Sequence, residues 1–186
     1  PKLETFDLSG NNLSGSVPRK LGTNGKLQFL ELSGNNLTGD LLQSLGSCQS
    51  LIGIYMDENM LSGSIPKGLF GLPNLTYVNL ADNRLSGGFP ETRDSVALNL
   101  LSVDISNNEL SGRLPPTIGN FSNLRELSLD GNMFSGSIPP EIGNLRWLLV
   151  IGLSSNNFSG KIPELPGEIP KSLSQLNNLI EMDLSQ

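Results

Sequence analysis

The sequence contains no histidine and a single cysteine among its 186 residues. Without histidine, the chain lacks the most common general base and the most common zinc ligand. Cys48 has no partner for an internal disulfide, and its leucine-rich surroundings without a nearby cation predict a buried, unreactive thiol. Serines are numerous but lie in a repeated turn, and no glycine-rich phosphate loop follows a strand. The sequence therefore predicts a non-enzymatic protein without a metal or cofactor.

Aromatic residues, positive charge and long apolar runs are also scarce. Aromatics make up 5% of the chain, and 12 Lys and Arg stand against 18 Asp and Glu, for a net charge of −6. A negative chain without clustered cations argues against nucleic acid as a partner. No apolar run approaches the roughly 18 to 20 residues of a membrane span, and the first residues show no signal-peptide pattern. Membrane association would therefore require an anchor outside this sequence.

A leucine opens eight similar phrases along the chain, and most of the intervals between these leucines are 24 residues. The phrases share the pattern L-x-x-L-x-L-x-x-N-x-L-s-G-x-I-P-x-x-L-x-x-L. Similarity at a fixed period is the signature of a leucine-rich repeat, in which each repeat buries its apolar face against the next. We therefore expect an α/β solenoid of about eight repeats, forming a single domain over residues 1–186. The opening leucines are Leu3, Leu27, Leu51, Leu75, Leu100, Leu124, Leu148 and Leu179.

Three segments of each repeat carry different structural expectations. The alternation in x-x-L-x-L-x-x predicts a half-buried strand, and stacked repeats should pair these strands into a parallel sheet on the concave side. The asparagine after each strand should both donate to and accept from buried backbone groups, as a ladder. The glycine and proline of L-s-G-x-I-P then predict a sharp turn that leads into a short 3₁₀ or helical segment on the convex side. The ladder asparagines are Asn11, Asn35, Asn59, Asn83, Asn108, Asn132 and Asn156.

Two repeats depart from the regular period. The interval from Leu75 to Leu100 is 25 residues, and residues 91–99 replace the leucine-spaced convex segment with a polar, irregular loop. The interval from Leu148 to Leu179 is 31 residues and contains a doubled Gly-x-Ile-Pro turn. This doubling fits either an insertion on the convex side or a seam between two joined stretches at 164–170.

The turn L-s-G-x-I-P, as in residues 61–66, resembles that of plant-type extracellular leucine-rich repeat proteins over the whole chain. The likeness extends to CLAVATA-type and BAM-type receptor kinases through residues 59–75, the irregular repeat after residue 90, and residues 118–139. Such receptors bind small secreted CLE-type peptides on the concave face and signal through a cytoplasmic kinase. The resemblance thus implies the ligand-binding segment of an ectodomain on the apoplastic side of the plasma membrane. A leucine-rich repeat co-receptor is a further partner that it implies.

Several parts of that family are missing from the sequence. Cysteine-paired terminal caps, a membrane span and kinase motifs do not occur, so we expect an internal piece of a larger ectodomain. Uncapped ends should leave Phe6 and Leu8 exposed at one end, and Met182 and Leu184 at the other. The Arg-x-Arg pair with which related receptors hold a peptide's C-terminal carboxylate is absent, because Arg113, Arg125 and Arg146 are isolated.

The outward strand positions of the concave side are the candidate ligand-binding site. Three aromatic residues on neighbouring strands should form a band flanked by carboxylates, and such a surface suits a short basic peptide. The alternatives are that these residues only keep the sheet soluble, or that Asp57, Glu58 and Asp82 bind calcium, which their spacing does not demand. The candidate residues are Phe29, Glu31, Tyr55, Asp57, Glu58, Tyr77, Asn79, Asp82, Asp104, Asn107, Glu126 and Asp130.

Five N-glycosylation sequons favour a secreted surface, although three of them arise from the repeat consensus itself. We expect all five in turns or convex segments. Two other functions stay open: a secreted inhibitor of a cell-wall-degrading enzyme, which should carry cysteine caps, and an ice-binding protein, which should carry a regular array of Thr or Ser. The sequon asparagines are Asn12, Asn36, Asn74, Asn120 and Asn157.

Overall fold

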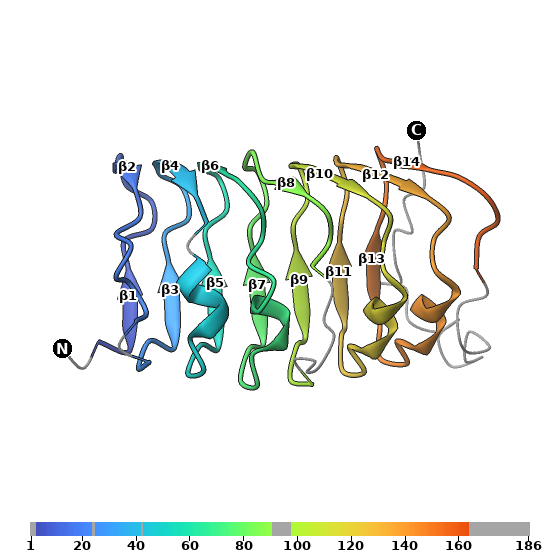
Figure 1. The fold of residues 1–186 in the computed structure, drawn as a ribbon, viewed down its shortest axis with the longest axis horizontal. Coiled ribbons are helices and arrows are strands. Elements are labelled where there is room, and N and C mark those ends of the chain that lie inside the picture. The colour runs from blue at the N-terminus through green and yellow to red at the C-terminus, as the bar shows by residue number, and fades with distance from the viewer. Residues whose placement is uncertain (1–2, 24, 42, 91–97, 164–186) are drawn as a thin grey trace, which may run out of the picture.

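The computed structural model describes residues 3–23, 25–41, 43–90 and 98–163. Seven coils stand side by side along the long axis of the molecule, as the sequence predicts (Figure 1). The eighth predicted coil, the doubled turn at 164–170 and most of the loop at 91–99 lie outside the described residues. Within the described part of the chain, no helix is long and apolar enough to cross a bilayer.

One strand from each coil joins a seven-stranded parallel sheet in the order of the sequence (Figure 1). Adjacent strands pair at equivalent repeat positions, for example Leu30 with Ile54 and Ile54 with Val78. These central residues are buried, and the residues on either side face outward, as the period-two pattern predicts. The strands are β1 (Thr5–Asp7), β3 (Phe29–Glu31), β5 (Gly53–Tyr55), β7 (Tyr77–Asn79), β9 (Ser102–Asp104), β11 (Glu126–Ser128) and β13 (Val150–Gly152).

The predicted asparagine ladder runs beside this sheet. The amide nitrogen of Asn59 donates to the carbonyl of Leu32 in the preceding coil at 3.0 Å and to Met56 in its own coil at 3.3 Å. Its amide oxygen accepts the Leu37 N–H at 3.0 Å. The same pattern recurs at Asn35, Asn83, Asn108, Asn132 and Asn156. Each side chain therefore satisfies backbone groups of two coils.

The segment L-s-G forms short strands, which the sequence analysis interpreted only as a turn. In each coil the chain stays extended after the ladder asparagine, and its backbone pairs with an adjacent described coil before a glycine with φ between 75° and 92° turns it. One such group comprises β2 (Ser14–Ser16), β4 (Asn36–Asp40) and β6 (Met60–Ser62). The other comprises β8 (Ser86–Gly87), β10 (Glu109–Gly112), β12 (Met133–Gly136) and β14 (Asn157–Phe158), and a Ser64–Ser86 bridge links the two.

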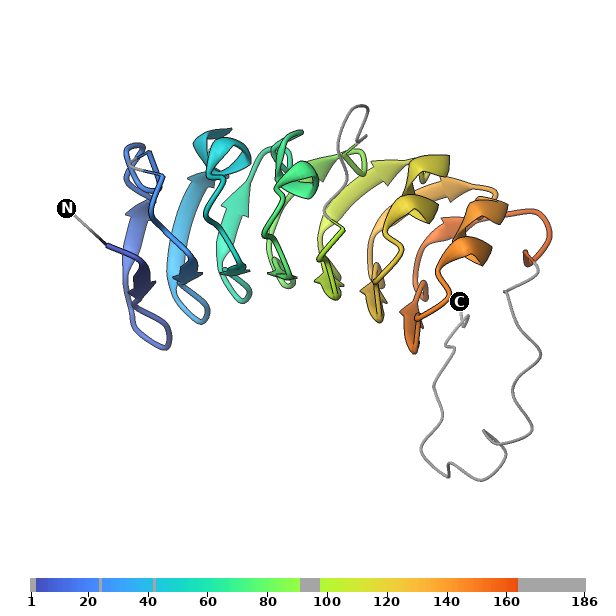
Figure 2. The ribbon, with the colours of Figure 1, turned by 90° about the horizontal axis from the view of Figure 1, so that it is seen from below.

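Short 3₁₀ turns lie along the convex side of the arc, opposite the main sheet (Figure 2). Two of them begin directly after the predicted proline, which is their N-cap residue, but proline does not decide whether a turn forms. The second coil lacks the proline and still forms η1. The first coil has Pro18, but its described residues make separate hydrogen-bonded turns, such as Pro18 to Leu21 and Lys20 to Thr23, and no 3₁₀ helix. Buried leucines such as Leu45 anchor the turn instead. The turns are η1 (Gln43–Ser47), η2 (Leu69–Gly71), η3 (Pro116–Asn120) and η4 (Pro140–Asn144).

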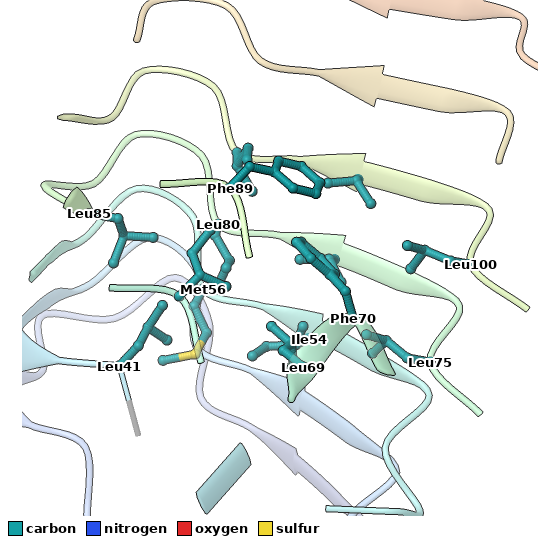
Figure 3. Packing of buried hydrophobic residues seen from close by; sticks show 14 of the residues in the cluster. Leu41, Ile54, Met56, Leu69, Phe70, Leu75, Leu80, Leu85, Phe89 and Leu100 are labelled. Carbon is teal, nitrogen blue, oxygen red and sulfur yellow. The ribbon is translucent and has the colours of Figure 1, made fainter. Parts of the chain in front are cut away.

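The core fills the space between the main sheet and the convex turns (Figure 3). In its centre the ring of Phe70 stacks on Phe89 with centroids 5.2 Å apart and meets Phe121 edge-on at 5.9 Å. The Cys48 thiol is 1% exposed and lies 3.5 Å from the Leu27 carbonyl, so its predicted burial is confirmed. In the first coil, Leu8 is 37% exposed, as expected, whereas Phe6 is half-buried because it packs against the core.

Candidate ligand-binding face

The twelve candidate residues all lie on the outward side of the main sheet, and none of them is buried. We number each repeat from its opening leucine as position 1, so that Leu51 is position 1 and Tyr55 is position 5 of the third coil. We call the outward positions 2, 3, 5, 7 and 8 of the seven described coils the concave face. Seven candidates are half-buried and five are exposed. The half-buried ones are Phe29, Glu31, Tyr55, Asp57, Asn79, Asp104 and Asp130, and the exposed ones are Glu58, Tyr77, Asp82, Asn107 and Glu126.

Three aromatic residues surround Gly53 at the start of β5. In the sheet register, Gly53 pairs with Phe29 on one side and with Tyr77 on the other. A Cβ added to Gly53 would lie 2.9 Å from Cδ1 of Phe29 and 2.9 Å from Cε2 of Tyr55. Both rings therefore occupy the space that a side chain at this position would take. We call Phe29, Gly53, Tyr55 and Tyr77 the aromatic floor.

The pKa of the Tyr55 phenol depends on its burial and on two neighbouring side chains. Burial raises the pKa of Tyr55 above 10.0, and the nearby Tyr77 and Glu31 raise this pKa further. Glu31 pairs with Tyr55 in the register of β3 and β5. At neutral pH the Tyr55 hydroxyl is therefore a firmly protonated hydrogen-bond donor beside a carboxylate.

Most carboxylates of the concave face accept hydrogen bonds from small polar neighbours. Ser154 donates to Asp130 from both its N–H and its hydroxyl at 2.8 Å, and the Ser106 hydroxyl donates to Asp104 at 2.6 Å. The remaining bonds run from Ser9 to Asp7, from Ser33 to Asp57, from Ser102 to Glu126, and from Asn107 to Asp82. Glu4, Glu31 and Glu58 differ, because their carboxylates have no hydrogen-bond partner among the described residues.

Charge on the concave face is one-sided. Nine acidic residues occupy its positions in the seven coils, against one basic residue, Arg125 in the sixth coil. The first five coils carry no Lys or Arg at these positions. The acidic residues are Glu4, Asp7, Glu31, Asp57, Glu58, Asp82, Asp104, Glu126 and Asp130. The potential over this face therefore favours a cationic ligand.

Position 8 of the repeat has left-handed backbone in every described coil, a feature that the sequence analysis missed. Glycine takes this position in three coils, but Glu58, Asp82 and Asn107 adopt φ of 52° to 53° in three successive coils. Such a conformation disfavours residues with a Cβ. The three side chains consequently line up at the edge of the sheet, where Asn107 bonds Asp82 at 2.9 Å.

The carboxylates of this edge do not form a metal centre. Among the described residues, no three Asp, Glu, Cys or His side chains converge closely enough to hold a metal ion. The calcium site considered for Asp57, Glu58 and Asp82 therefore lacks the convergent oxygen ligands that it requires.

A cavity of about 450 Å³ lies away from the concave face, between the fourth, fifth and sixth coils. Four prolines form much of its wall, together with Arg113 and Glu141. The Oε2 atom of Glu141 is buried without a hydrogen-bond partner among the described residues. None of the sequence-predicted site residues reaches this cavity.

The structure exposes all five sequon asparagines, but not all of them lie in turns as expected. Asn36 and Asn157 begin strands β4 and β14. The amide of Asn36 donates to the side chain of Asn12 in the preceding coil, and the amide of Asn74 donates to the Gln49 carbonyl at 2.9 Å. Each amide nitrogen keeps a second hydrogen for other chemistry.

Comparison with protein-family models identifies the repeat. The model described as Leucine Rich Repeat matches residues 2–24, 26–48, 74–92, 99–121 and 123–145. The chain belongs to the leucine-rich repeat family. A search of curated proteins found no match.

Several solved structures share the solenoid. The ectodomain of the Arabidopsis receptor kinase HAESA, solved with an IDA peptide hormone, is 36% identical with a TM-score of 0.83, over 97% of this chain and 33% of that one. The ectodomain of GASSHO1/SCHENGEN3 from Arabidopsis thaliana, solved with CASPARIAN STRIP INTEGRITY FACTOR 2, is 32% identical with a TM-score of 0.66, over 99% of this chain and 24% of that one. A plant ice-binding protein is 31% identical with a TM-score of 0.73, over 89% of this chain and 52% of that one.

This chain is thus similar to ectodomains of plant leucine-rich repeat receptor kinases, and it spans about a third or less of the length of those two receptors. HAESA has also been solved with the co-receptor SERK1. These likenesses do not distinguish CLAVATA-type or BAM-type receptors from other peptide receptors, so that finer resemblance stays a prediction.

Proposed function

We propose that this chain is a ligand-binding segment of a plant cell-surface receptor kinase ectodomain, and that its concave face binds a small secreted peptide. The kinase would lie outside this sequence, on the far side of the membrane. The aromatic floor is the observation that carries the proposal. Large apolar rings at solvent-facing strand positions gain little from exposure to water, but they provide anchors for a partner.

Two further features support this proposal. The concave face is acidic along its first five coils, so a peptide with positive charge would be drawn to it. Receptors with the same solenoid, such as HAESA, were solved with peptide hormones. An extracellular location, on the apoplastic side of the plasma membrane, follows from the same likeness and from the exposed sequons. A leucine-rich repeat co-receptor is a natural second partner, as SERK1 is for HAESA.

Calorimetric titration of the chain with a panel of secreted plant peptides tests the proposal. A peptide that binds wild type should bind Tyr55→Ala and Tyr77→Ala at least about tenfold more weakly, because each substitution removes an exposed anchor. Met133→Ala is the matched control, since Met133 is 54% exposed on β12, away from the concave face. Equal binding by wild type and both tyrosine variants would show that the ligand binds elsewhere.

Ice binding is the second candidate, because a plant ice-binding protein shares the fold. A hydroxyl residue does follow the leucine or phenylalanine that opens this turn in every described coil, as in Ser14, Thr38 and Ser62. These hydroxyls do not face one another, however, because the short strands are staggered by two residues: Ser14 pairs with Asn36, and Thr38 pairs with Met60. The outward positions of the concave face carry no regular array of Thr or Ser in the described coils either. A flat hydroxyl array is thus missing from the described coils, and thermal hysteresis in ice solutions would measure the activity directly.

An inhibitor of a cell-wall-degrading enzyme is the remaining alternative from the sequence. No feature of the described residues favours it over the receptor reading. Inhibition assays with secreted polygalacturonases would test it.

A further inference from the structure

The aromatic floor has a geometry that selects a particular kind of side chain. Because Gly53 has no side chain, the rings of Phe29 and Tyr55 both come within 2.9 Å of the place where its Cβ would be. The two rings therefore lie over the backbone of Gly53, in the space that a side chain at this position would fill. Tyr77 borders the same glycine on the next strand and is 38% exposed. The result is a broad aromatic surface within the concave face.

A carboxylate stands at the edge of this floor without a partner. Glu31 pairs with Tyr55 across β3 and β5, and it contributes to the raised pKa of the Tyr55 phenol, so its charge lies close to the ring. Six other carboxylates of the face accept a hydrogen bond from a serine or asparagine. The Glu31 carboxylate accepts none from the described residues, and no basic residue occupies a concave position in the first five coils.

Resting on the proposed function, we infer that the aromatic floor with Glu31 binds the cationic side chain of an arginine or lysine in the peptide ligand. Aromatic faces attract cations, and a flat guanidinium can stack on a ring while its N–H groups reach a carboxylate. Arginine is the better match, because its planar group fits a flat floor and its edge reaches Glu31. Gly53 is the positioning residue, since it lets the rings lie flat.

Other occupants would leave a different signature. A neutral aromatic or proline side chain would use the ring faces but would gain nothing from Glu31. A purely electrostatic encounter would use the acidic face but would not require Gly53. The rings and the carboxylate must both contribute if a cationic side chain is the occupant.

Capped pentapeptides with a central arginine, lysine or citrulline between glycines test the inference in an NMR titration of the chain. Citrulline keeps the shape of arginine and removes its charge. The arginine peptide should bind about tenfold more tightly than the citrulline peptide, with shifts at Phe29, Tyr55 and Tyr77, and lysine should be intermediate. No saturable binding of the arginine peptide, or equal binding of arginine and citrulline, would overturn the inference.

Variants separate the two contributions. Glu31→Gln should remove most of the preference for arginine over citrulline, whereas Glu109→Gln, an exposed carboxylate on β10 away from the concave face, should preserve it. Gly53→Ala should weaken arginine binding because the added Cβ lifts the rings. Glu31→Gln keeps the test decisive even if Gly53→Ala fails to fold, and an unchanged preference in Glu31→Gln would refute the role of Glu31.

The outcome is distinguishable from that of the proposed function. If a secreted peptide binds at Tyr55 and Tyr77 and an arginine-to-citrulline change anywhere in it costs no affinity, the cationic site is wrong and the receptor proposal stands. If no secreted peptide binds but the arginine pentapeptide does, the site stands without the receptor proposal.

Discussion

Asn59 and Leu37, 22 residues apart in the sequence, are joined by a buried hydrogen bond of 3.0 Å from the Leu37 N–H to the Asn59 side-chain oxygen. The same asparagine donates to the carbonyl of Leu32 at 3.0 Å. One side chain of the third coil therefore satisfies two backbone groups of the second coil, just after its strand β3 ends and within its extended segment β4. The solenoid depends on such side chains because its turns are buried between coils, where water cannot replace them.

Replacing Asn59 with leucine should destabilise the chain by about 2–4 kcal/mol. The substitution fills the space but leaves the buried Leu37 N–H without a partner, and the Leu32 carbonyl keeps only its hydrogen bond from Asn35. A buried unsatisfied group costs about 1–3 kcal/mol, and the lost hydrogen bond to Leu32 adds to that cost. Urea denaturation followed by circular dichroism measures the change. Asn144→Ala is the control, because Asn144 is exposed in η4 and should change stability by less than about 0.5 kcal/mol. A similar loss in both variants would contradict the ladder's role.

Alkaline titration should report the surroundings of Tyr55. The chain has two tyrosines, so in a Tyr77→Phe background the ultraviolet absorbance of tyrosinate follows Tyr55 alone. Burial keeps its pKa above 10.0 in this background, and Glu31→Gln should then lower that pKa toward 10.0, because a neighbouring negative charge is removed. A pKa unchanged by Glu31→Gln would place Glu31 too far from the phenol to matter.

The same shift predicts how stability depends on pH. The folded state favours the neutral phenol, so the unfolded chain loses its proton first as the pH rises. The contribution of Tyr55 to stability is therefore fully present below pH 10.0 and is lost as the pH rises through the folded pKa. Tyr55→Phe should remove this part of the alkaline loss of stability, as measured by denaturation at pH values on either side of 10.0.

The regular parts of this molecule follow from its sequence because every repeat places the same residue types at the same positions. The spacing of Leu30, Leu32 and Asn35 predicts a strand, its buried face and the ladder, and the structure confirms all three. The outward positions of Tyr55 and Tyr77 follow by the same counting. Whether they bind a ligand is a separate question, which the peptide titrations address.

Other features escape a position-by-position reading because they depend on neighbouring coils. The short strands that begin at residues such as Met60 form only because adjacent coils offer matching backbone groups. The serines that bond Asp57 and Glu126 come from a preceding coil, 24 residues away. A usable signal existed for Gly53, which is the only glycine at position 3 among the described coils and stands between Phe29 and Tyr77 in the stack.

Gly119→Ala should destabilise the convex side by about 1–3 kcal/mol. An added Cβ would lie 2.3 Å from the carbonyl oxygen of Glu141, so η3 and η4 would have to move apart. Gly88→Ala is the matched control, because the nearest atom to its added Cβ is 3.7 Å away and its φ is not positive. Thermal denaturation of both variants should show a lower Tm for Gly119→Ala alone, and an unchanged Tm would mean that the turns adapt without cost.

A glycan on Asn12 should hinder glycosylation of Asn36, and a glycan on Asn36 should hinder glycosylation of Asn12. These two asparagines lie on adjacent coils, and the amide of Asn36 donates to the side chain of Asn12. Parallel strands stand roughly 4.8 Å apart, which is less than the width of a glycan, so a glycan on one asparagine crowds the other. Asn74, Asn120 and Asn157 are exposed, and the adjacent described coils carry no sequon at the equivalent repeat positions.

Expression of the chain through the secretory pathway of plant cells, followed by peptide mass mapping, measures this occupancy. Asn74, Asn120 and Asn157 should be glycosylated independently, whereas Asn12 and Asn36 together should carry about one glycan per chain. Asn12→Gln should then raise the occupancy of Asn36, because the crowding is relieved while Asn36 keeps its exposed position on β4. Full occupancy of both asparagines in the same molecule would show that the glycans splay apart and that the spacing of the coils does not limit them.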